Sequence, residues 1–373
     1  MLKKYPVIKW SLAALLSVVL LVVAFGVWFM SMVPSGAERG QLETTMPADL
    51  PYIFRNKNPV RGKILAVVTS QAEMGHSGKK TGYELTELAR PYYVFKANGF
   101  EVDVASPRGG IPPAVIDKDD MGSFDYAFLN DSTAQRKVNH TIAIAEVRPE
   151  EYEGVYFVGG KGAMYDFPED ASIQQIVQTY DDEGKIIGAV CHGPAALVNV
   201  VQKNGDLYLA GKKVCGFTNE EELFLIPEAA SLFPFLLQSK LVAQGGSFEE
   251  GHRYLNNVIQ DGNLITGQNP WSTWSVAEAM VRQLGYSPVE RKHTAEENTI
   301  DILSAYADSG YLEAKSGIRT ALAQKKPIDR TLLAMHCIVS AMEYDMGGTF
   351  DKLRLLAYAK RLSAREGTSR PED

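Results

Sequence analysis

The sequence predicts an α/β domain built on a parallel sheet, and three observations lead to that prediction. A strand, a helix and a second strand follow one another between residues 63 and 106, as in a βαβ unit. The short apolar run Ile186–Val190 leads directly into Cys191-His192-Gly193-Pro194. Another predicted strand, at residues 153–158, is followed at once by a cluster of glycines. Both turns are therefore expected at the carboxyl edge of the sheet, where open α/β folds bind their ligands.

Length and composition narrow the class of protein. The chain has 373 residues, which is enough for a sizeable core and a second domain. A hydrophobic content of 45% and a charged content of 22% indicate a mostly globular protein. The formal net charge of −7 argues against a nucleic-acid-binding surface. The 3 cysteines are too few for a disulfide framework, although a single Cys215–Cys337 pair stays open.

An uncharged apolar run predicts one transmembrane helix over residues 10–32. Lysines precede the run, so residues 1–9 are expected in the cytoplasm and the catalytic domain outside it, in the periplasm or extracellular space. The alternative is a cleaved signal peptide, since Ser35-Gly36-Ala37 offers small residues for cleavage. The length of the apolar run favours an uncleaved, single-pass anchor.

The elements of the α/β domain follow in order. Residues 33–62 lack a clear period and are expected to tether the membrane helix to a domain at 63–287. Within that domain the patterns predict a strand at 64–69, a helix at 82–98, a strand at 101–106, loops over 107–139, a strand at 153–158, a helix at 168–182 and a strand at 186–190. After the turn at Cys191 they predict the start of a helix at 195–201, strands at 212–218, 241–243 and 257–267, and a helix from 269 to about 285.

The character of the chain changes after this domain. Residues 288–366 show only helical periodicity and are expected to form a small all-helical extension. The helices are predicted at 296–314, 318–324, 331–346 and 349–365. Residues 367–373 are expected to be a disordered tail.

The turn at Cys191 has the layout of a nucleophile elbow, with cysteine in the place of serine. A helix that begins after the turn would direct its N-terminus at the thiol and favour the thiolate. A free cysteine is also a common core residue. Because the strand, the Cys-His pair, the glycine and the helix fall in register, the pattern favours a reactive thiol.

Glu87 lies four residues before Pro91 in the predicted helix at 82–98. Pro91 has no N–H to donate to the carbonyl of Glu87, so the helix is expected to kink there with Glu87 on its apolar side. The alternative is a solvated Glu87 at a helix start, with Pro91 in the first turn. The pattern alone does not separate these two interpretations.

The glycine cluster at residues 159–162 allows backbone N–H groups to converge on a small anionic oxygen. It matches neither a P-loop nor a dinucleotide-binding fingerprint. The histidines outside the Cys-His pair show no close spacing, so we interpret them as surface or core residues and predict no metal site: His76, His140, His252, His293 and His336.

Six motifs in order make residues 63–285 resemble the ThiJ/PfpI superfamily. They are Glu87-Leu88-Ala89-Arg90-Pro91, Val104-Ala105-Ser106-Pro107-Arg108-Gly109-Gly110, Gly159-Gly160-Lys161-Gly162-Ala163-Met164-Tyr165-Asp166, Ala189-Val190-Cys191-His192-Gly193-Pro194, Gly216-Phe217-Thr218-Asn219-Glu220-Glu221-Glu222 and Thr266-Gly267-Gln268-Asn269-Pro270. The resemblance implies the class I glutamine amidotransferase-like fold, a flavodoxin-like parallel-sheet sandwich around a nucleophile elbow. The glyoxalase III and Hsp-type chaperone branch is the most similar.

The resemblance also implies roles for particular residues. Cys191 would be the nucleophile, with His192 and Glu87 beside it as catalytic residues. The backbone N–H groups of Gly160 and His192 would form the oxyanion site. A third acidic residue would orient His192, and Glu222 fits best by its place in the motif. Its neighbours Glu220 and Glu221 stay open as rivals.

Two parts of the pattern depart from the family. Lys161 replaces the histidine of a Gly-Gly-His-Gly motif, so it would either add a cation near the mouth of the pocket or be solvated. Trp271 and Trp274 replace small residues after Asn-Pro, so they would either narrow the pocket or be core aromatics. The predicted membrane helix and the residues after Glu290 lie outside the resemblance.

The resemblance implies a cysteine-dependent enzyme that needs no cofactor: no metal, glutathione or nucleotide. The first hypothesis is a glyoxalase III-like lyase or a deglycase-like enzyme, acting on a small 2-oxoaldehyde such as methylglyoxal. A cysteine amidase or peptidase with the same residues is an alternative. A chaperone or stress-protection binding module with a vestigial site is another. The resemblance leaves a homo-oligomer open.

Overall fold

The computed structural model describes residues 6–34, 42–54 and 60–368. The chain divides into two compact units. The larger is Gly40–Lys292, and the smaller combines Met1–Arg39 with His293–Asp373. Lys3 and Lys4, on which the predicted topology partly depends, lie outside the described residues.

A seven-stranded sheet forms the centre of the larger unit, in the order β10-β11-β7-β6-β1-β3-β5. The strands are β1 Lys63–Val67, β3 Glu101–Ser106, β5 Ile142–Ala143, β6 Gly154–Phe157, β7 Ile186–Val190, β10 Val258–Asp261 and β11 Leu264–Gly267. Neighbours pair in parallel except in the hairpin β10–β11, which turns at Gly262 with φ +58°. The predicted parallel sheet and the predicted hairpin are confirmed.

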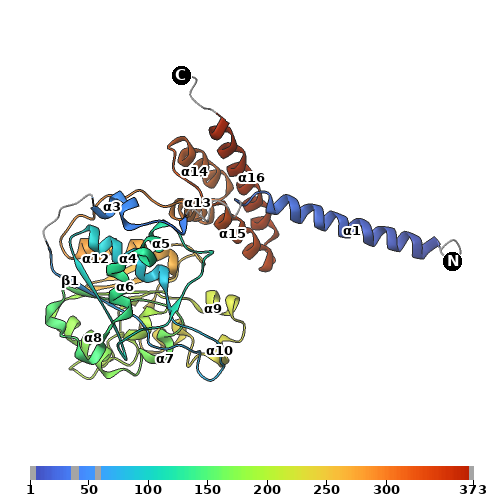
Figure 1. Ribbon diagram of the computed structural model, residues 1–373. Coiled ribbons are helices and arrows are strands. Elements are labelled where there is room, and N and C mark those ends of the chain that lie inside the picture. The colour runs from blue at the N-terminus through green and yellow to red at the C-terminus, as the bar shows by residue number, and fades with distance from the viewer. Residues whose placement is uncertain (1–5, 35–41, 55–59, 369–373) are drawn as a thin grey trace, which may run out of the picture. The chain divides into compact units, whose positions relative to one another are not determined.

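Helices cover both faces of this sheet (Figure 1). On one side are α4 Leu85–Ala97 and α12 Thr273–Gln283, and on the other are the short α7 Ala163–Asp166 and α8 Ala171–Glu183. Every residue of β6 and β7 is buried, because the helices shield these central strands on both faces. This explains why their sequences read as continuous apolar runs without alternation.

The segment at 107–139, which we predicted to be loops, is partly helical. It contains α5 Ser123–Asn130 and α6 Ser132–Asn139, while β4 Ala114–Val115 pairs with β2 Tyr83–Glu84. Helices of two turns are too short to show a clear apolar period, so the prediction failed there. Their start signals were present: Asp131 caps α6 by accepting the N–H of Thr133 at 2.9 Å.

Two further expectations are wrong. Residues 241–243 lie in the helix α11 Leu237–Ala243 instead of a strand, because three apolar residues fit either structure. The strand predicted at 212–218 is the short β8 Lys213–Val214, which pairs with β9 Ser247–Phe248 outside the main sheet. The tether is also shorter than predicted: η2 Pro47–Asp49 and α3 Pro51–Phe54 are folded, and Tyr52 is buried in the core.

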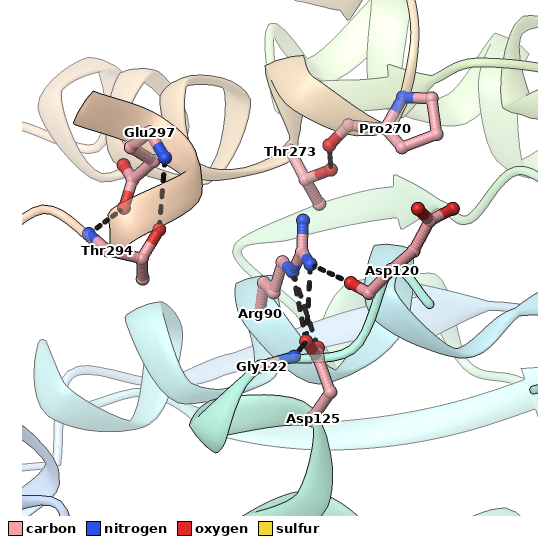
Figure 2. Close-up of polar contacts among 8 residues, drawn as sticks. All are labelled: Arg90, Asp120, Gly122, Asp125, Pro270, Thr273, Thr294 and Glu297. Atoms are coloured by element: carbon pink, nitrogen blue, oxygen red, sulfur yellow. Dashed lines mark hydrogen bonds and ion pairs between the residues drawn. The ribbon is translucent and has the colours of Figure 1, made fainter. Parts of the chain in front are cut away.

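A buried ion pair connects α4 to α5 (Figure 2). Arg90 of α4 and Asp125 of α5 approach to 3.2 Å, with side chains 2% and 1% exposed. The Asp125 carboxylate also accepts the N–H of Gly122 at 2.8 Å, and Arg90 Nη2 donates to the carbonyl of Asp120 at 2.9 Å. Because these partners satisfy both charges inside the protein, the pair fixes the helix that carries Glu87.

Replacement of Asp125 by alanine is expected to destabilise the larger unit by about 3–5 kcal/mol, since it leaves the Arg90 guanidinium buried without its counter-charge. Urea denaturation of the full chain in detergent, followed by tryptophan fluorescence, measures the change. The matched control is Glu228→Gln, which removes the exposed Lys79–Glu228 pair and is expected to leave the midpoint unchanged. Equal midpoints for the two variants would contradict a stabilising role of the buried Arg90–Asp125 pair.

Every regular element in the described part of the smaller unit is a helix. Its helices are α1 Pro6–Met30, α13 Ala295–Ser309, α14 Tyr311–Ala323, α15 Arg330–Met342 and α16 Met346–Thr368. The first predicted C-terminal helix, at 296–314, is interrupted by Gly310 at φ +82°. Of the predicted tail, residues 367 and 368 are helical, and residues 369–373 lie outside the described part of the chain.

α1 is long and apolar enough to cross a membrane: the window Ala13–Met30 has a mean hydropathy of 2.6, and none of it is buried. A signal sequence meets the same criteria. The helix is therefore confirmed, and its membrane role stays a prediction.

Candidate active site

Cys191 occupies a sharp turn directly after β7. Its φ of +57° lies in the left-handed region, which residues with a side chain rarely adopt. Hydrogen bonds hold the turn on both sides: the Cys191 N–H donates to the Gly267 carbonyl at 2.9 Å, and the Phe217 N–H donates to the Cys191 carbonyl at 2.9 Å. Such a strained, over-determined backbone is typical of a nucleophile elbow, so the predicted turn is confirmed.

The helix predicted after the turn is wrong. Only the five-residue 3₁₀ helix η5 Gly193–Leu197 follows, and the chain becomes extended at Val198. One 3₁₀ turn aligns few peptide dipoles, so it gives a thiolate little support. Instead, burial raises the pKa of the Cys191 thiol well above its usual value, and the nearby Glu87 raises it further. Cys191 is 3% exposed, and it needs a base to become a nucleophile.

His192 connects the thiol to an acidic residue. Its Nδ1 lies 3.3 Å from Cys191 Sγ, and its Nε2 lies 2.5 Å from Glu222 Oε2. The imidazole is 2% exposed and packs against the ring of Phe217, with centroids 4.8 Å apart. The structure thus brings Cys191, His192 and Glu222 into one hydrogen-bonded chain, as the resemblance implied.

The two rivals of Glu222 are occupied elsewhere. Glu221 lies at the start of α9 Asn219–Leu225, where its carboxylate accepts the N–H of Thr218 at 3.0 Å and that of Tyr254 at 2.7 Å. The exposed Glu220 forms an ion pair with Arg253. Only Glu222 of the three is hydrogen-bonded to His192 in the described part of the chain.

Glu222→Gln is expected to lower kcat by about 10²-fold for a reaction in which His192 takes a proton from Cys191. A neutral amide cannot stabilise the imidazolium that forms in that step. Glu220→Gln is the matched control and is expected to keep wild-type kcat. Steady-state kinetics of the two full-length variants measure the difference. Similar kcat values for both would contradict the orienting role of Glu222.

Glu87 is fully buried in α4, and Pro91 lies inside the same helix. The buried interpretation of the sequence is therefore confirmed, and the solvated one is wrong. The Glu87 carboxyl lies beside the Cys191 thiol and the Gly159 N–H. Among the described residues, neither of its oxygens has a partner in good hydrogen-bond geometry. A buried carboxyl of this kind is a candidate proton donor or acceptor.

Burial raises the pKa of Glu87 well above its usual value, as it does for Cys191. Glu87 raises the pKa of the Cys191 thiol further, whereas the thiol, as a hydrogen-bond donor, lowers the pKa of Glu87. We therefore expect the pair to lose its first proton as a unit, with at most one of the two groups ionised near neutral pH.

Two glycines after β6 bring the backbone against this pair. A side chain at Gly159 would overlap the Glu87 carboxyl, and its Cβ would lie 2.9 Å from Cys191 Cβ. Gly160 has a φ of +105°, and a Cβ there would lie 2.7 Å from the Glu84 nitrogen. Neither the Gly160 N–H nor the His192 N–H donates to an acceptor in the described residues, so both are available to a ligand oxygen.

The two departures from the family pattern have different outcomes. Lys161 is half-buried, and its charge lowers the pKa of Glu84, Glu87 and Cys191, so the cation lies close to the site. Trp271 is also half-buried, and its backbone N–H donates to Asn269 Oδ1 at 3.1 Å. In the described part of the chain, Trp271 makes no hydrogen bond or ring contact with Cys191, His192 or Glu87.

Trp274, in contrast, is a core aromatic. Its ring centroid lies 4.9 Å from that of Phe124, and the guanidinium carbon of Arg291 lies 4.0 Å from the Trp274 centroid. The core interpretation is therefore correct for this residue.

Two residues near the site were not predicted. Burial raises the pKa of Glu84 to about 7, and its charge acts on both Glu87 and Cys191. The spacing of Glu84 and Glu87 by three residues at a helix start could have indicated it. Tyr156, on β6, donates from its hydroxyl to the Glu87 carbonyl at 3.0 Å. No sequence signal pointed to this contact.

The chain is similar to known proteins over this unit. Residues 79–283 match the model of the DJ-1/PfpI family. The chain is 31% identical over 235 residues to Glyoxalase 3 of Candida albicans, covering 59% of this chain and 97% of that protein. It is 31% identical over 230 residues to the glutathione-independent glyoxalase HSP31 of Saccharomyces cerevisiae, which covers 58% of this chain and 94% of that protein.

Solved structures are similar as well. The Rapid Encystment Protein 24 KDa of Francisella tularensis has a TM-score of 0.57 and 34% identity, over 60% of this chain and 99% of that one. Glyoxalase III from Candida albicans has a TM-score of 0.55 and 27% identity, and the match covers 61% of this chain and 98% of that one.

Proposed function

We propose that this chain, which belongs to the DJ-1/PfpI family, is a glutathione-independent glyoxalase of the glyoxalase III type. Its substrate class is the small 2-oxoaldehydes, such as methylglyoxal, and its product is the corresponding 2-hydroxy acid. One observation carries the proposal: the buried Cys191 thiol lies beside both a histidine and a buried carboxyl, and the N–H groups of Gly160 and His192 have no acceptor among the residues that the structure describes. The similarity to fungal glyoxalases supports the choice of reaction.

The first step is addition to the aldehyde. A base, either Glu87 or His192, takes the Cys191 proton, and the sulfur forms a bond to the aldehyde carbon. The π electrons of the carbonyl move to its oxygen, which the N–H groups of Gly160 and His192 stabilise. Protonation of this oxygen gives a hemithioacetal.

The second step moves hydrogen between neighbouring carbons. A base removes the proton from the former aldehyde carbon, an enediol forms, and a proton returns to the former ketone carbon. This leaves a thioester on Cys191 and a hydroxyl on the neighbouring carbon. Water then cleaves the thioester, which releases the hydroxy acid and restores the thiol. The aldehyde carbon is oxidised and the ketone carbon is reduced, so no external oxidant is required.

The test is turnover of methylglyoxal by the full chain, purified in detergent and free of glutathione. We expect lactate to form, measured as its D and L forms by enantiomer-specific assays. No lactate from a folded protein would overturn the proposal. Cys191-dependent cleavage of amides or peptides would instead indicate a hydrolase. Suppression of client aggregation that survives Cys191→Ala, without turnover, would indicate a binding module.

We also propose that α1 anchors the protein in a membrane, with its N-terminus in the cytoplasm and the catalytic unit on the other side. The length, hydropathy and exposure of Ala13–Met30 support this topology. Alkaline carbonate extraction of membranes and protease protection of the C-terminus test it. Release of an N-terminally shortened protein would favour the signal-peptide alternative.

A further inference from the structure

The hydroxyl of Tyr156 replaces a hydrogen bond that helix α4 cannot make. In an uninterrupted helix, the carbonyl of Glu87 would accept the N–H of residue 91. That residue is Pro91, which has no N–H. Tyr156, fully buried on the neighbouring β6, donates to this carbonyl at 3.0 Å instead.

This contact fixes the backbone of Glu87 from β6, the strand that leads into the glycines of the site. A buried carbonyl without a partner is unfavourable, so the Tyr156 hydroxyl holds the Glu87 segment against β6. The same strand leads into Gly159, whose N–H lies beside the Glu87 carboxyl. β6 therefore holds the backbone of Glu87, and the segment that follows β6 passes beside the Glu87 carboxyl.

We propose that Tyr156 is a positioning residue that, together with Pro91, holds the Glu87 carboxyl in reach of the Cys191 thiol. Tyr156 acts only through Glu87 and has no part in proton transfer. Burial raises the pKa of its phenol well above the usual value, so it remains a hydrogen-bond donor at physiological pH. The turnover measurement below rests on the proposed function, and the measurement of Cys191 alkylation does not.

The test is Tyr156→Phe, measured in two ways. We expect kcat for methylglyoxal to fall by about 10²-fold with little change in KM, since a displaced acid–base group affects the chemical steps. We also expect the pH profile of Cys191 alkylation by iodoacetamide to move to lower pH, because Glu87 raises the pKa of the thiol. Mass spectrometry of the Cys191 peptide follows alkylation without any turnover.

Two further variants make the test specific. Tyr180→Phe is the matched control, since it removes another buried tyrosine hydroxyl that donates to a backbone carbonyl, that of Pro149 at 3.3 Å. It is expected to change neither readout. Pro91→Ala restores the missing N–H, so the double variant Tyr156→Phe, Pro91→Ala is expected to recover both readouts to within about tenfold of wild type.

The proposal is overturned if Tyr156→Phe behaves like Tyr180→Phe, or if the double variant shows no recovery. If Tyr156→Phe does not fold, the double variant decides, because it is expected to fold and to show the wild-type alkylation profile. Absence of turnover in the wild type would refute the proposed function alone. The alkylation profiles would still decide the role of Tyr156.

A separate observation concerns the turn between α15 and α16. Large exposed apolar side chains lie along the second half of α15, in the turn and at the start of α16: Met335, Ile338, Met342, Tyr344, Met346 and Phe350. The spacing of the first three places them on one face of α15, and Met346 and Phe350 share a face of α16. We call this set the apolar turn face. Met342 and Phe350 are 60% and 62% exposed, which is costly for a surface in water.

Ser31, the residue after α1, belongs to the same unit and contacts α16. Lys360 Nζ donates to Ser31 Oγ at 3.2 Å, one residue before Met32, whose side chain is 2% exposed. If α1 crosses a bilayer, this contact holds the C-terminal helices at the bilayer surface. Side chains such as Met, Ile, Phe and Tyr are stable in the interfacial region of a membrane.

We infer that the apolar turn face lies in the interfacial region of the bilayer that α1 crosses. This inference rests on the proposed anchoring. Glu343 and Asp345 lie at the turn, and their carboxylates do not favour contact with anionic lipid. Phosphatidylcholine vesicles are therefore the appropriate probe.

The test uses the full chain reconstituted in these vesicles. Met342→Cys and Phe350→Cys variants are labelled with an environment-sensitive fluorophore, and brominated phosphatidylcholine is the quencher. Gln324→Cys is the matched control, since it is exposed in the loop at the opposite end of α15. The native cysteines are buried, and labelled wild type gives their background.

We expect quenching at both turn positions and none at the control position. No quenching in protein that resists carbonate extraction would overturn this inference and leave the anchoring intact. Protein released by carbonate would overturn both. A change in emission that depends on protein concentration without quenching would identify a second copy as the partner, and would also overturn the inference.

Discussion

Cys191→Ala is expected to abolish lactate formation from methylglyoxal, with a loss of at least about 10³-fold in kcat/KM. The thiol forms the bond that every later step requires, so no neighbouring group can replace it. The residual rate should equal that of buffer alone. The measurement is the initial rate of lactate formation over a range of methylglyoxal concentrations below and above the wild-type KM, which gives kcat/KM.

Cys337→Ala is the matched control. Its thiol is buried like that of Cys191, but it lies on α15 in the smaller unit. It is expected to keep wild-type turnover, which would separate the loss of a nucleophile from the loss of a buried sulfur. Substantial turnover by Cys191→Ala would refute the covalent mechanism, even if the protein is a glyoxalase.

The elbow could be predicted because its signals are local. A buried parallel strand is apolar along its whole length, and the glycines at 159–162 fall directly after such a strand. The carboxyl ends of neighbouring parallel strands meet at one edge, so Cys191 and Gly160 had to lie close together. The predicted ThiJ/PfpI resemblance is confirmed for the same reason: its motifs follow the strand ends in order.

Other features depend on contacts that the sequence does not encode locally. The choice among Glu220, Glu221 and Glu222 depends on the direction of α9, which the cap at Thr218 sets. The Arg90–Asp125 pair joins two helices, one of which was predicted to be a loop. The thiolate was expected from a helix dipole, but burial and a neighbouring carboxyl determine the pKa of Cys191. Only the packed structure shows the burial of both groups.

Glu87→Gln is expected to lower kcat by about 10²- to 10⁴-fold, because the amide has the shape of the carboxyl but cannot transfer a proton. The thiol should respond in the opposite direction. Glu87 raises the pKa of Cys191, so its removal lowers that pKa and moves the alkylation profile to lower pH. A thiol that is more reactive toward iodoacetamide in a protein that turns over far less substrate would identify Glu87 as the acid–base group.

The same variant changes how stability depends on pH. The pKa of Glu87 is raised in the folded protein, so between its unfolded and folded values the folded state binds more protons than the unfolded state. Stability of the wild type should therefore fall as pH rises above about 4.3, the unfolded value, until the folded pKa is passed. In Glu87→Gln this loss is absent, so the variant should gain stability relative to wild type as pH increases.

Thermal unfolding of both proteins between pH 5 and pH 8 measures this difference, with the exposed Glu101→Gln as control. Parallel curves for wild type and Glu87→Gln would mean that Glu87 titrates normally, which is incompatible with a proton shared with Cys191. Diverging curves together with the loss of turnover would show that the burial of Glu87 serves the reaction at the expense of stability. A buried carboxyl destabilises the fold near neutral pH, and the same burial keeps its proton available for the reaction.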